Sequence, residues 1–326
     1  MQKRVFGRSG LQISVLGFGC GAVGGLMVRG DAAEQERTIA RALEAGVNYF
    51  DTAALYGQGA SETNLGRVLR TLRPKDCIVG TKVRLEAADA ARIGPAIEAS
   101  LEASLRRLGM EQVDILHLHN TIRSSGGGDT LTAKQVLEEV VPALATLRQK
   151  GKVRLLGVTA VGDTPALHEA IGAGVFDSAQ VVYNLLNPSA GGPAPASLPG
   201  QDYGNLLARC AAAGTGVVGI RVLAGGTLSG SAERHPIASP PPAPIGSAAR
   251  YDDDLRNARR FLPLIECGEA ASLAEAATRY AISNSDIGTI LVGMATFEQF
   301  EQSLAAVLKG PLSPAALARV AQLQAG

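Results

Sequence analysis

Four side chains of this sequence could together move a proton to or from an oxygen atom: Asp51, Tyr56, Lys82 and His119. A tyrosine hydroxyl, with a pKa of about 10, is a poor acid at neutral pH, but a neighbouring lysine ammonium stabilises the phenolate and lowers that pKa. A lysine among apolar residues needs a counter-charge, which Asp51 supplies. A neutral imidazole at His119 can polarise a carbonyl oxygen. The set predicts protonation of an oxygen while hydride reaches carbon, and it does not suit a hydrolase, which needs a nucleophile or a metal-bound water.

These side chains lie in or next to apolar runs that alternate with amphipathic stretches. Each run is short, rich in Val, Ile and Leu and nearly continuous in apolar character, which is typical of strands buried on both faces. The predicted strands are Leu16–Cys20, Asn48–Ala53, Cys77–Val83, Val113–His119, Val153–Thr159, Ala179–Asn184, Gly216–Val222 and Thr289–Gly293. The predicted helices are Ala32–Glu44, Ser61–Leu72, Gly94–Leu108, Ala133–Gln149, Thr164–Ala173, Gly204–Ala213 and a helical region from Asp252 to Ala281.

Eight strand–helix units predict a parallel α/β architecture, and eight units that close on one another form a (β/α)8 TIM barrel. We expect residues 1–326 to form a single barrel domain with an N-terminal hairpin of Arg4–Gly7 and Leu11–Val15. The barrel would gather the four side chains at the C-terminal ends of its strands, where barrel enzymes place catalytic groups. Long Pro-containing loops follow strands on that face, and the one at 228–254 is either a lid or a disordered connector.

Composition narrows the classes of function. Lys and Arg number 31 against 30 Asp and Glu, so the net charge is +1 and a basic nucleic-acid surface is not expected. No apolar run reaches the roughly 18 residues of a membrane span, and the N-terminus lacks the apolar core of a signal peptide, so we expect a cytoplasmic protein. The four cysteines form no CxxC pair, and the His117–His119 pair has no carboxylate cluster around it, so no metal site is expected. The oligomeric state is not predicted.

The segment Gly19–Gly24 matches the pattern GxGxxG after a predicted strand. A dinucleotide fingerprint of that kind must open a helix and be followed by an acid at the end of the next strand, about 20 residues on. Here the next helix begins only near Asp31, and Asp51 has a different neighbourhood. We therefore interpret this segment as a glycine-rich loop in which the backbone makes a close approach to a neighbouring group, and not as the nucleotide-binding turn of a Rossmann fold.

The spaced motifs resemble those of the aldo-keto reductases. They read Asp51-Thr-Ala-x-x-Tyr56-Gly, Gly59-x-Ser-Glu-x-x-Leu-Gly66, Thr81-Lys82 and Asp114-x-x-x-x-His119, in this order along nearly the whole chain. The resemblance implies a barrel that binds NAD(H) or NADP(H) at its mouth. It also implies Tyr56 as general acid and base, Lys82 and Asp51 as the pair that tunes it, and His119 as the residue that orients the carbonyl.

The resemblance carries the cofactor contacts over only in part. Gln180 matches the family residue that holds the nicotinamide carboxamide, and Thr159 keeps a hydroxyl where the family has Ser, although the following Asn is replaced by Ala160. The family's aromatic-Ser-Pro-Leu after the seventh strand is replaced by Ile220-Arg-Val-Leu. The remaining expected contacts come from the loops at the strand ends: Gly19, Arg221, Leu223 and Gly225.

Recognition of a 2′-phosphate needs cations near the adenosine ribose, because the phosphate carries a charge of about −2. In the family those cations follow the eighth strand, but Gly293–Gln299 holds none and has one acid. The next helix, opening at Thr296, is expected to present free N–H groups, and Gln299, Gln302 and Ser303 could bond the ribose or adenine. NAD is slightly favoured over NADP.

Three functions remain open. The leading hypothesis is an NAD(P)-dependent oxidoreductase that interconverts a carbonyl and an alcohol on a small molecule. The first alternative is an NAD-dependent dehydrogenase of an aldose or ring alcohol that works in the oxidative direction. The second is a regulatory subunit that binds nucleotide without turnover, against which the complete set of four side chains argues.

Overall fold

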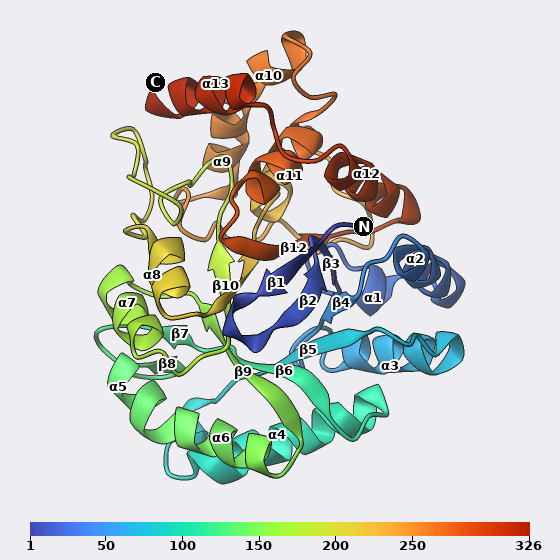
Figure 1. Cartoon of the computed structure of the whole chain (residues 1–326), viewed down its shortest axis with the longest axis vertical. Helices are drawn as coiled ribbons and strands as arrows, with labels where there is room; N and C mark the ends of the chain where they lie inside the picture. The colour runs from blue at the N-terminus through green and yellow to red at the C-terminus, as the bar shows by residue number, and fades with distance from the viewer.

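The computed structural model describes residues 1–326, and its central feature is a closed barrel of eight parallel strands (Figure 1). Consecutive barrel strands are neighbours, from β3 through β4, β5, β6, β9, β10 and β11 to β12, which pairs with β3. The strands are β3 (Leu16–Gly19), β4 (Tyr49–Asp51), β5 (Ile78–Val83), β6 (Val113–Leu118), β9 (Val153–Ala160), β10 (Ser178–Val182), β11 (Gly216–Ile220) and β12 (Ile287–Gly293). The predicted (β/α)8 barrel is confirmed, and all eight predicted strands are present with shifts of a few residues at their ends.

Helices connect the strands and cover the outside of the barrel (Figure 1). They are α1 (Leu26–Arg29), α2 (Ala32–Glu44), α3 (Ala60–Leu72), α4 (Ile93–Leu108), α5 (Ala133–Gln135) continuing through a π-turn into α6 (Val141–Gln149), α7 (Thr164–Gly172), α8 (Leu206–Ala212), α11 (Leu273–Ser283), α12 (Phe297–Leu308) and α13 (Pro314–Ala325). Side-chain caps fix several starts: Asp31 accepts from the amides of the first turn of α2, and Asp163 does so for α7.

The helical region expected at Asp252–Ala281 is present, but it is not one continuous helix. The structure divides it into α9 (Tyr251–Ala258), a 3-10 turn, α10 (Pro263–Glu266) and α11. Pro263 has no amide hydrogen and begins a new helix, because proline is tolerated only in a first turn. Gly268 then takes a positive φ of 74°, a conformation that ends a helix.

An N-terminal hairpin closes one end of the barrel, as predicted. β1 (Lys3–Phe6) pairs antiparallel with β2 (Leu11–Ser14), and the hairpin crosses in front of the barrel in Figure 1. Phe6 and Ile13 are fully buried against apolar side chains of the barrel interior. A Cβ at Gly216 would lie only 2.7 Å from the ring of Phe6. The barrel is therefore a packed core at this end, and its open end is the C-terminal face.

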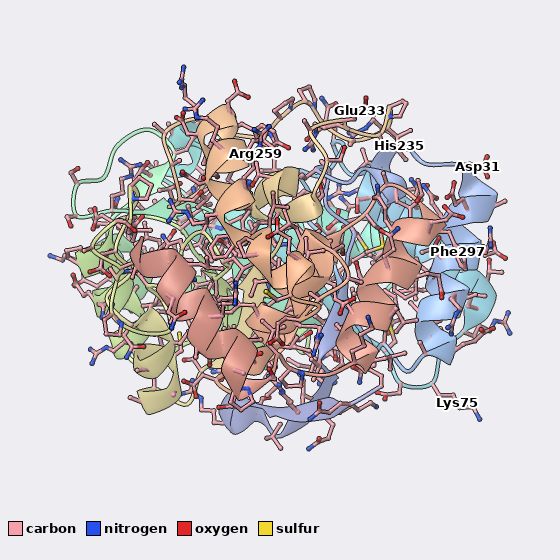
Figure 2. The ribbon with its side chains drawn as sticks, turned by 90° about the horizontal axis from the view of Figure 1, so that it is seen from above. Asp31, Lys75, Glu233, His235, Arg259 and Phe297 are labelled. Carbon is pink, nitrogen blue, oxygen red and sulfur yellow. The ribbon has the colours of Figure 1, made fainter.

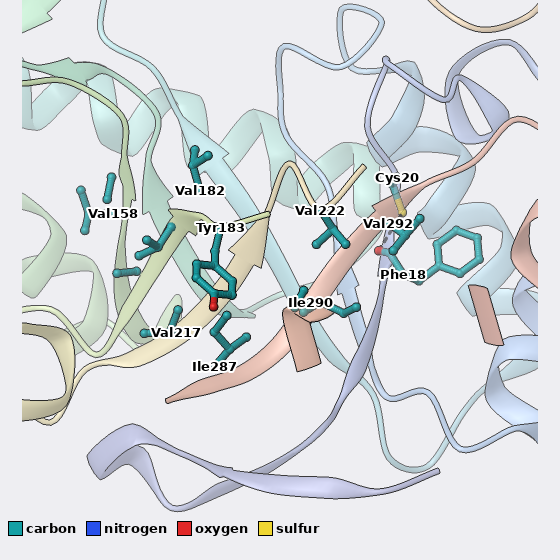
Figure 3. Packing of buried hydrophobic residues seen from close by; sticks show 14 of the residues in the cluster. Phe18, Cys20, Val158, Val182, Tyr183, Val217, Val222, Ile287, Ile290 and Val292 are labelled. Atoms are coloured by element: carbon teal, nitrogen blue, oxygen red, sulfur yellow. Dashed lines mark hydrogen bonds between the residues drawn. The ribbon is translucent and has the colours of Figure 1, made fainter. Parts of the chain in front are cut away.

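A second apolar layer lies between the strands and the helices. Figure 3 shows part of it, including Phe18 of β3. The Phe18 ring centroid lies 5.7 Å from that of Phe50 on β4 and 5.8 Å from that of Phe300 on α12. This packing fixes α12, which follows the last barrel strand, against the beginning of the barrel.

The Pro-rich loop at 228–254 lies at the end of the molecule opposite the hairpin, where Figure 2 labels His235. Arg234 donates to the backbone of the loop that follows β11, and Arg29 donates to the carbonyl of Ile237 at 2.6 Å. The loop therefore bridges the segments after β3 and β11 at the C-terminal face. Of the two alternatives, the structure supports an ordered segment over the barrel mouth.

The glycine-rich segment after β3 is not a dinucleotide fingerprint, because it belongs to a barrel. A Cβ at Gly24 would lie 2.3 Å from the amide nitrogen of Met294, and one at Gly25 would lie 2.1 Å from the carbonyl oxygen of Ile237. The glycines thus allow close backbone approach. No helix combines the length and the apolar character needed to cross a membrane.

Removing the aromatic ring that fills the closed end should destabilise the protein. We expect Phe6→Ala to lower the free energy of unfolding by about 3–5 kcal/mol, because it deletes a fully buried ring that packs among apolar side chains of the barrel interior and against the backbone at Gly216. Urea unfolding followed by circular dichroism measures this change. Val5→Ala is the control, since Val5 is 61% exposed and should change stability by less than about 0.5 kcal/mol. Equal losses in the two variants would contradict the role given to Phe6.

Candidate active site

The barrel brings the predicted aspartate and lysine into direct contact. Asp51 ends β4, Lys82 lies near the end of β5, and their side chains are 4% and 0% exposed. Lys82 Nζ donates to Asp51 Oδ2 and, at 2.8 Å, to the carbonyl oxygen of Thr52. Burial alone would lower the pKa of Lys82, but Asp51 and then Tyr56 oppose it, and the pKa is raised above its usual value. Lys82 is therefore a charged ammonium inside the barrel.

The second carboxylate oxygen of Asp51 is also fully occupied. Tyr49 donates its hydroxyl to Oδ1 at 3.0 Å, and Gln180 donates its side-chain amide to the same atom at 2.6 Å. Gly80 leaves room for this arrangement, because a Cβ there would lie 2.7 Å from the Tyr49 hydroxyl. The sequence prediction missed Tyr49, although its position two residues before Asp51 on a strand indicates the same face.

Tyr56 lies in the loop between β4 and α3, and its ring is next to Lys82 and His119. Lys82 Nζ is 4.7 Å from the centroid of the Tyr56 ring, and the ring of His119 meets it edge-on, with centroids 6.0 Å apart. Burial raises the pKa of the Tyr56 phenol; Lys82 lowers it and Asp51 raises it further, with a net rise. Lys82 therefore lowers the pKa of Tyr56, as expected, but burial has the larger effect.

His119 follows β6 and is neutral. Its backbone amide donates to the carbonyl of Val83 at 2.8 Å, which places the ring at the barrel mouth. Burial, followed by the charges of Lys82 and Arg84, lowers the pKa of His119 to about 3. A neutral imidazole is the form that was predicted, and its buried Nδ1 has no hydrogen-bond partner within the protein.

His117 faces the barrel interior and has a different environment from His119. Its Nε2 lies 2.9 Å from the hydroxyl oxygen of Ser178, and Gly157 leaves space for the ring, since a Cβ there would lie 2.3 Å from it. His117 is thus a packed, hydrogen-bonded barrel residue. No group of three or more His, Cys, Asp or Glu side chains is arranged to hold a metal ion.

The start of α3 holds the Tyr56 loop in place. Ser61 donates to the carbonyl of Cys20 at 2.9 Å, and its oxygen lies 2.8 Å from the hydroxyl of Thr52. Glu62 is fully buried and accepts from Thr81 and from Arg107, each at 2.6 Å. These contacts give the Ser-Glu part of the motif a structural role, because they tie α3 to the strands that carry Asp51 and Lys82.

The residues predicted to contact a cofactor lie around the same mouth. Gly19 and Gly293 are register partners at the ends of β3 and β12. Thr159 is the register partner of Gln180, and its buried hydroxyl has no hydrogen-bond partner. Gln180 itself contacts Asp51, so its amide nitrogen is already engaged.

The loop after β11 provides a second group of candidates. Burial lowers the pKa of Arg221, which takes a positive φ of 58° and makes one long bond, 3.4 Å, to the carbonyl of Ala243. The segment from Leu223 to Gly226 forms a tight turn with positive φ values at Ala224, Gly225 and Gly226, in which the amide of Gly226 donates to the carbonyl of Leu223 at 2.8 Å. The amide of Gly226 is therefore already engaged in a hydrogen bond within the turn. The Arg221 guanidinium, in contrast, has no carboxylate within ion-pair distance.

The expectation that α12 begins with free amides is wrong. Glu34 of α2 accepts from the amide of Phe297 at 3.0 Å, and Thr296 caps the amide of Gln299 at 3.3 Å. Gln299 accepts from the amide of Ala295 through its side-chain oxygen, at 2.7 Å. Ser303 donates to the carbonyl of Gln299 at 3.0 Å, and the side chain of Gln302 is exposed. A carboxylate from a distant helix supplies the anion that a helix N-terminus attracts.

Comparisons with known proteins agree with this architecture. A family model described as Aldo/keto reductase family matches residues 15–325. The L-galactose dehydrogenase of Arabidopsis thaliana is 30% identical over 320 residues, which cover 94% of this chain and 88% of that protein. The D-threo-aldose 1-dehydrogenase of a Pseudomonas species is 30% identical over 250 residues, covering 68% and 70%. The holo form of the Bacillus halodurans aldo-keto reductase AKR11C1 superposes with a TM-score of 0.73 at 25% identity, covering 99% of this chain and 96% of that one.

Loss of the Lys82 charge should reduce stability and activity together. Lys82→Met leaves Asp51 as an unpaired buried carboxylate, which costs about 3–5 kcal/mol when a buried pair is broken. Chemical unfolding and nicotinamide-linked turnover measure the two effects. Lys134→Met is the matched control, because the side chain of Lys134 is 74% exposed and pairs only with Glu138. Unchanged stability of Lys82→Met would mean that Asp51 and Lys82 do not form a buried ion pair.

The neutral state of His119 predicts a pH dependence of stability. Its pKa of about 3 in the folded protein lies below the ordinary 6.5, so the unfolded chain binds a proton that the folded protein does not. The stability that neutral His119 contributes is therefore fully present above the pKa of histidine in the unfolded chain, and it is lost as the pH falls below that value. Between pH 7.5 and 5 we expect wild type to lose about 2 kcal/mol more than His119→Asn. His235→Asn, in an exposed loop, should behave like wild type; equal pH profiles for wild type and His119→Asn would contradict the assignment.

Proposed function

The chain belongs to the aldo/keto reductase family, and we propose that it interconverts a carbonyl and an alcohol on a small molecule, with NAD(H) or NADP(H) as hydride carrier and Tyr56 as general acid and base. One observation carries this proposal: a buried, charged Lys82 lies between a fully paired carboxylate and the ring of Tyr56, with a neutral His119 edge-on to that ring. We expect a cytoplasmic enzyme.

The residues at the barrel mouth suit a nicotinamide nucleotide. Thr159 and His119 each have a buried polar atom without a partner, and Arg221 has a half-buried cation without a carboxylate. A Cβ added at Gly21 would lie 3.9 Å from the Tyr56 ring, so the backbone after β3 runs directly beside the tyrosine. Arg221 and the Leu223–Gly226 turn are the groups proposed to hold its phosphates. The bound cofactor supplies or accepts the hydride.

The side chains of this chain perform the proton transfer. In reduction, Tyr56 gives its hydroxyl proton to the carbonyl oxygen, and Lys82 stabilises the phenolate that forms. The neutral imidazole of His119 donates a hydrogen bond to the same oxygen and orients it. The raised pKa of Tyr56 keeps the phenol protonated at neutral pH, the form that reduction needs. Oxidation needs the phenolate, so it should accelerate as the pH rises.

A second candidate function is an aldose or ring-alcohol dehydrogenase that works in the oxidative direction. The relatives named L-galactose dehydrogenase and D-threo-aldose 1-dehydrogenase favour it, since each is 30% identical over most of the chain. An aldose panel with oxidised cofactor, compared with a carbonyl panel with reduced cofactor, separates the two directions. Absence of turnover with both panels, together with nucleotide binding, would favour a regulatory subunit.

We also propose NAD as the preferred cofactor. The segment Gly293–Gln299 has no cation to match the charge of a 2′-phosphate. The amide of Phe297, at the start of α12, is bonded to a carboxylate. Kinetics with both cofactors test the preference.

Removing the Tyr56 hydroxyl should abolish most turnover without removing the nucleotide site. We expect Tyr56→Phe to lower kcat by roughly 10²–10⁴, the usual contribution of a general acid or base, and to leave the dissociation constant of the reduced cofactor unchanged. Nicotinamide absorbance with a panel of carbonyl substrates measures turnover, and fluorescence titration measures binding. Tyr183→Phe is the control, because its hydroxyl pairs with Tyr280 at 3.0 Å. A Tyr56→Phe variant that keeps more than about a third of wild-type kcat, far outside that range, would rule out the assignment.

A further inference from the structure

Three side chains of α2 face the start of α12. Glu34, Arg37 and Arg41 are spaced i, i+3 and i+7, which places them on one side of the helix. Glu34 accepts from the amide of Phe297, the guanidinium of Arg37 lies 3.7 Å from the centroid of the Phe297 ring, and Arg41 pairs with Glu301 at 2.8 Å. Figure 1 shows α2 and α12 as neighbours, and Figure 2 labels Phe297 on the side of the molecule where α2 begins.

This contact lies where a barrel offers a phosphate site. In TIM barrels such sites are formed by the loops after the seventh and eighth strands and by a helix N-terminus. Here β12 is the eighth barrel strand, and α12 starts four residues after it ends. The amides of a first helical turn are the groups that would bind an anion.

Two amides in the first turn of α12 already have acceptors within the protein. The amide of Phe297 is bonded to Glu34, and that of Gln299 is bonded to the hydroxyl of Thr296. Hydrogen bonding with its own amide and with Thr296 holds the pKa of Glu298 below its usual value. Two carboxylates, those of Glu34 and Glu298, thus lie next to the start of α12.

The charge at this position is negative. Glu34 and Glu298 contribute two carboxylates, and Arg37, which also lowers the pKa of Glu298, contributes the one guanidinium in contact with the first turn. A 2′-phosphate of charge about −2 would meet this excess of negative charge and would have to displace Glu34 from its amide. A ribose hydroxyl, in contrast, can donate a hydrogen bond to a carboxylate, as it does at the acidic residue of other NAD sites.

We propose that Glu34 is a specificity-determining residue: its carboxylate, held on the Phe297 amide, excludes a 2′-phosphate and accepts a ribose hydroxyl, so that the protein discriminates NAD(H) from NADP(H) by repulsion. This inference rests on the proposed function, because it requires a nicotinamide nucleotide at the barrel mouth. Discrimination of this kind comes from a group that opposes the wrong ligand rather than from an added contact to the right one.

Glu34→Gln tests the charge without removing the hydrogen bond, because the amide oxygen of Gln can still accept from Phe297. Isothermal titration with NADH and NADPH gives both dissociation constants without turnover. We expect wild type to bind NADH at least about tenfold more tightly, a difference of about 1.4 kcal/mol. In Glu34→Gln the ratio should fall by at least about fivefold, mainly through tighter binding of NADPH.

Glu36→Gln is the matched control, since Glu36 lies on the same helix and its carboxylate approaches Arg67 at 3.7 Å rather than α12. Its binding ratio should equal that of wild type. Glu298→Gln is a second variant at the exposed side of the helix start and should shift the ratio in the same direction as Glu34→Gln. Thermal unfolding of each variant verifies that the α2–α12 contact remains.

The outcomes separate two kinds of failure. If neither NADH nor NADPH binds wild type, the proposed function itself is wrong. If NADH binds but Glu34→Gln and Glu298→Gln leave the ratio unchanged, the proposed function stands and the role of Glu34 is wrong. Tighter binding of NADPH to wild type that is lost in Arg37→Ala would also overturn the proposal, because Arg37 would then be a 2′-phosphate receptor.

Discussion

The buried ion pair between Asp51 and Lys82 is the constraint on which the site depends. Both side chains are almost fully removed from solvent, so each charge is tolerable only while the other is present. The remaining carboxylate oxygen is bound by Tyr49 and Gln180. One carboxylate therefore links β4, β5 and β10, and a shift in the register of any of these strands would expose an unpaired charge in the barrel.

Burial acts differently on the three groups around that carboxylate, and the differences define the chemistry. Burial raises the pKa of Tyr56 and lowers that of His119, whereas at Lys82 the interactions with Asp51 and Tyr56 together outweigh it. At neutral pH the site thus holds a phenol, a neutral imidazole and an ammonium. The phenol can give a proton, the imidazole can donate a hydrogen bond and the ammonium is a fixed positive charge. This combination suits the proposed protonation of a carbonyl oxygen.

The two ends of the barrel have opposite roles. Phe6 and Ile13 of the hairpin fill the N-terminal end, so the apolar interior is closed there. At the C-terminal end, Arg29 of α1 and Arg234 of the Pro-rich loop bridge segments that follow different strands. Packed apolar side chains fill the closed end, whereas His119 and Thr159, which each have a buried polar atom without a partner, lie at the open end.

The sequence by itself determined the eight barrel strands, the hairpin, most helices and the four catalytic candidates. The physical reason is that hydrophobic periodicity and strand-end positions are local properties of the chain. The helical region expected over Asp252–Ala281 is divided into several helices for a local reason, since Pro263 and Gly268 interrupt it. The charged state of Tyr56 could not be predicted, because it depends on the depth of burial, which only packing sets.

The tertiary structure alone decided which partners the polar groups have. The Glu34–Phe297 bond joins residues 263 positions apart, and the Gln180–Asp51 bond joins residues 129 positions apart. Neither pair shares a pattern in the sequence. Glu34 is an acid in the first turn of an amphipathic helix. It becomes a partner of α12 only because the barrel closes and brings α12, which follows the last barrel strand, against α2, which follows the first. The local sequence determines which segments become helices and strands, whereas the closure of the barrel determines which ends of those elements come into contact.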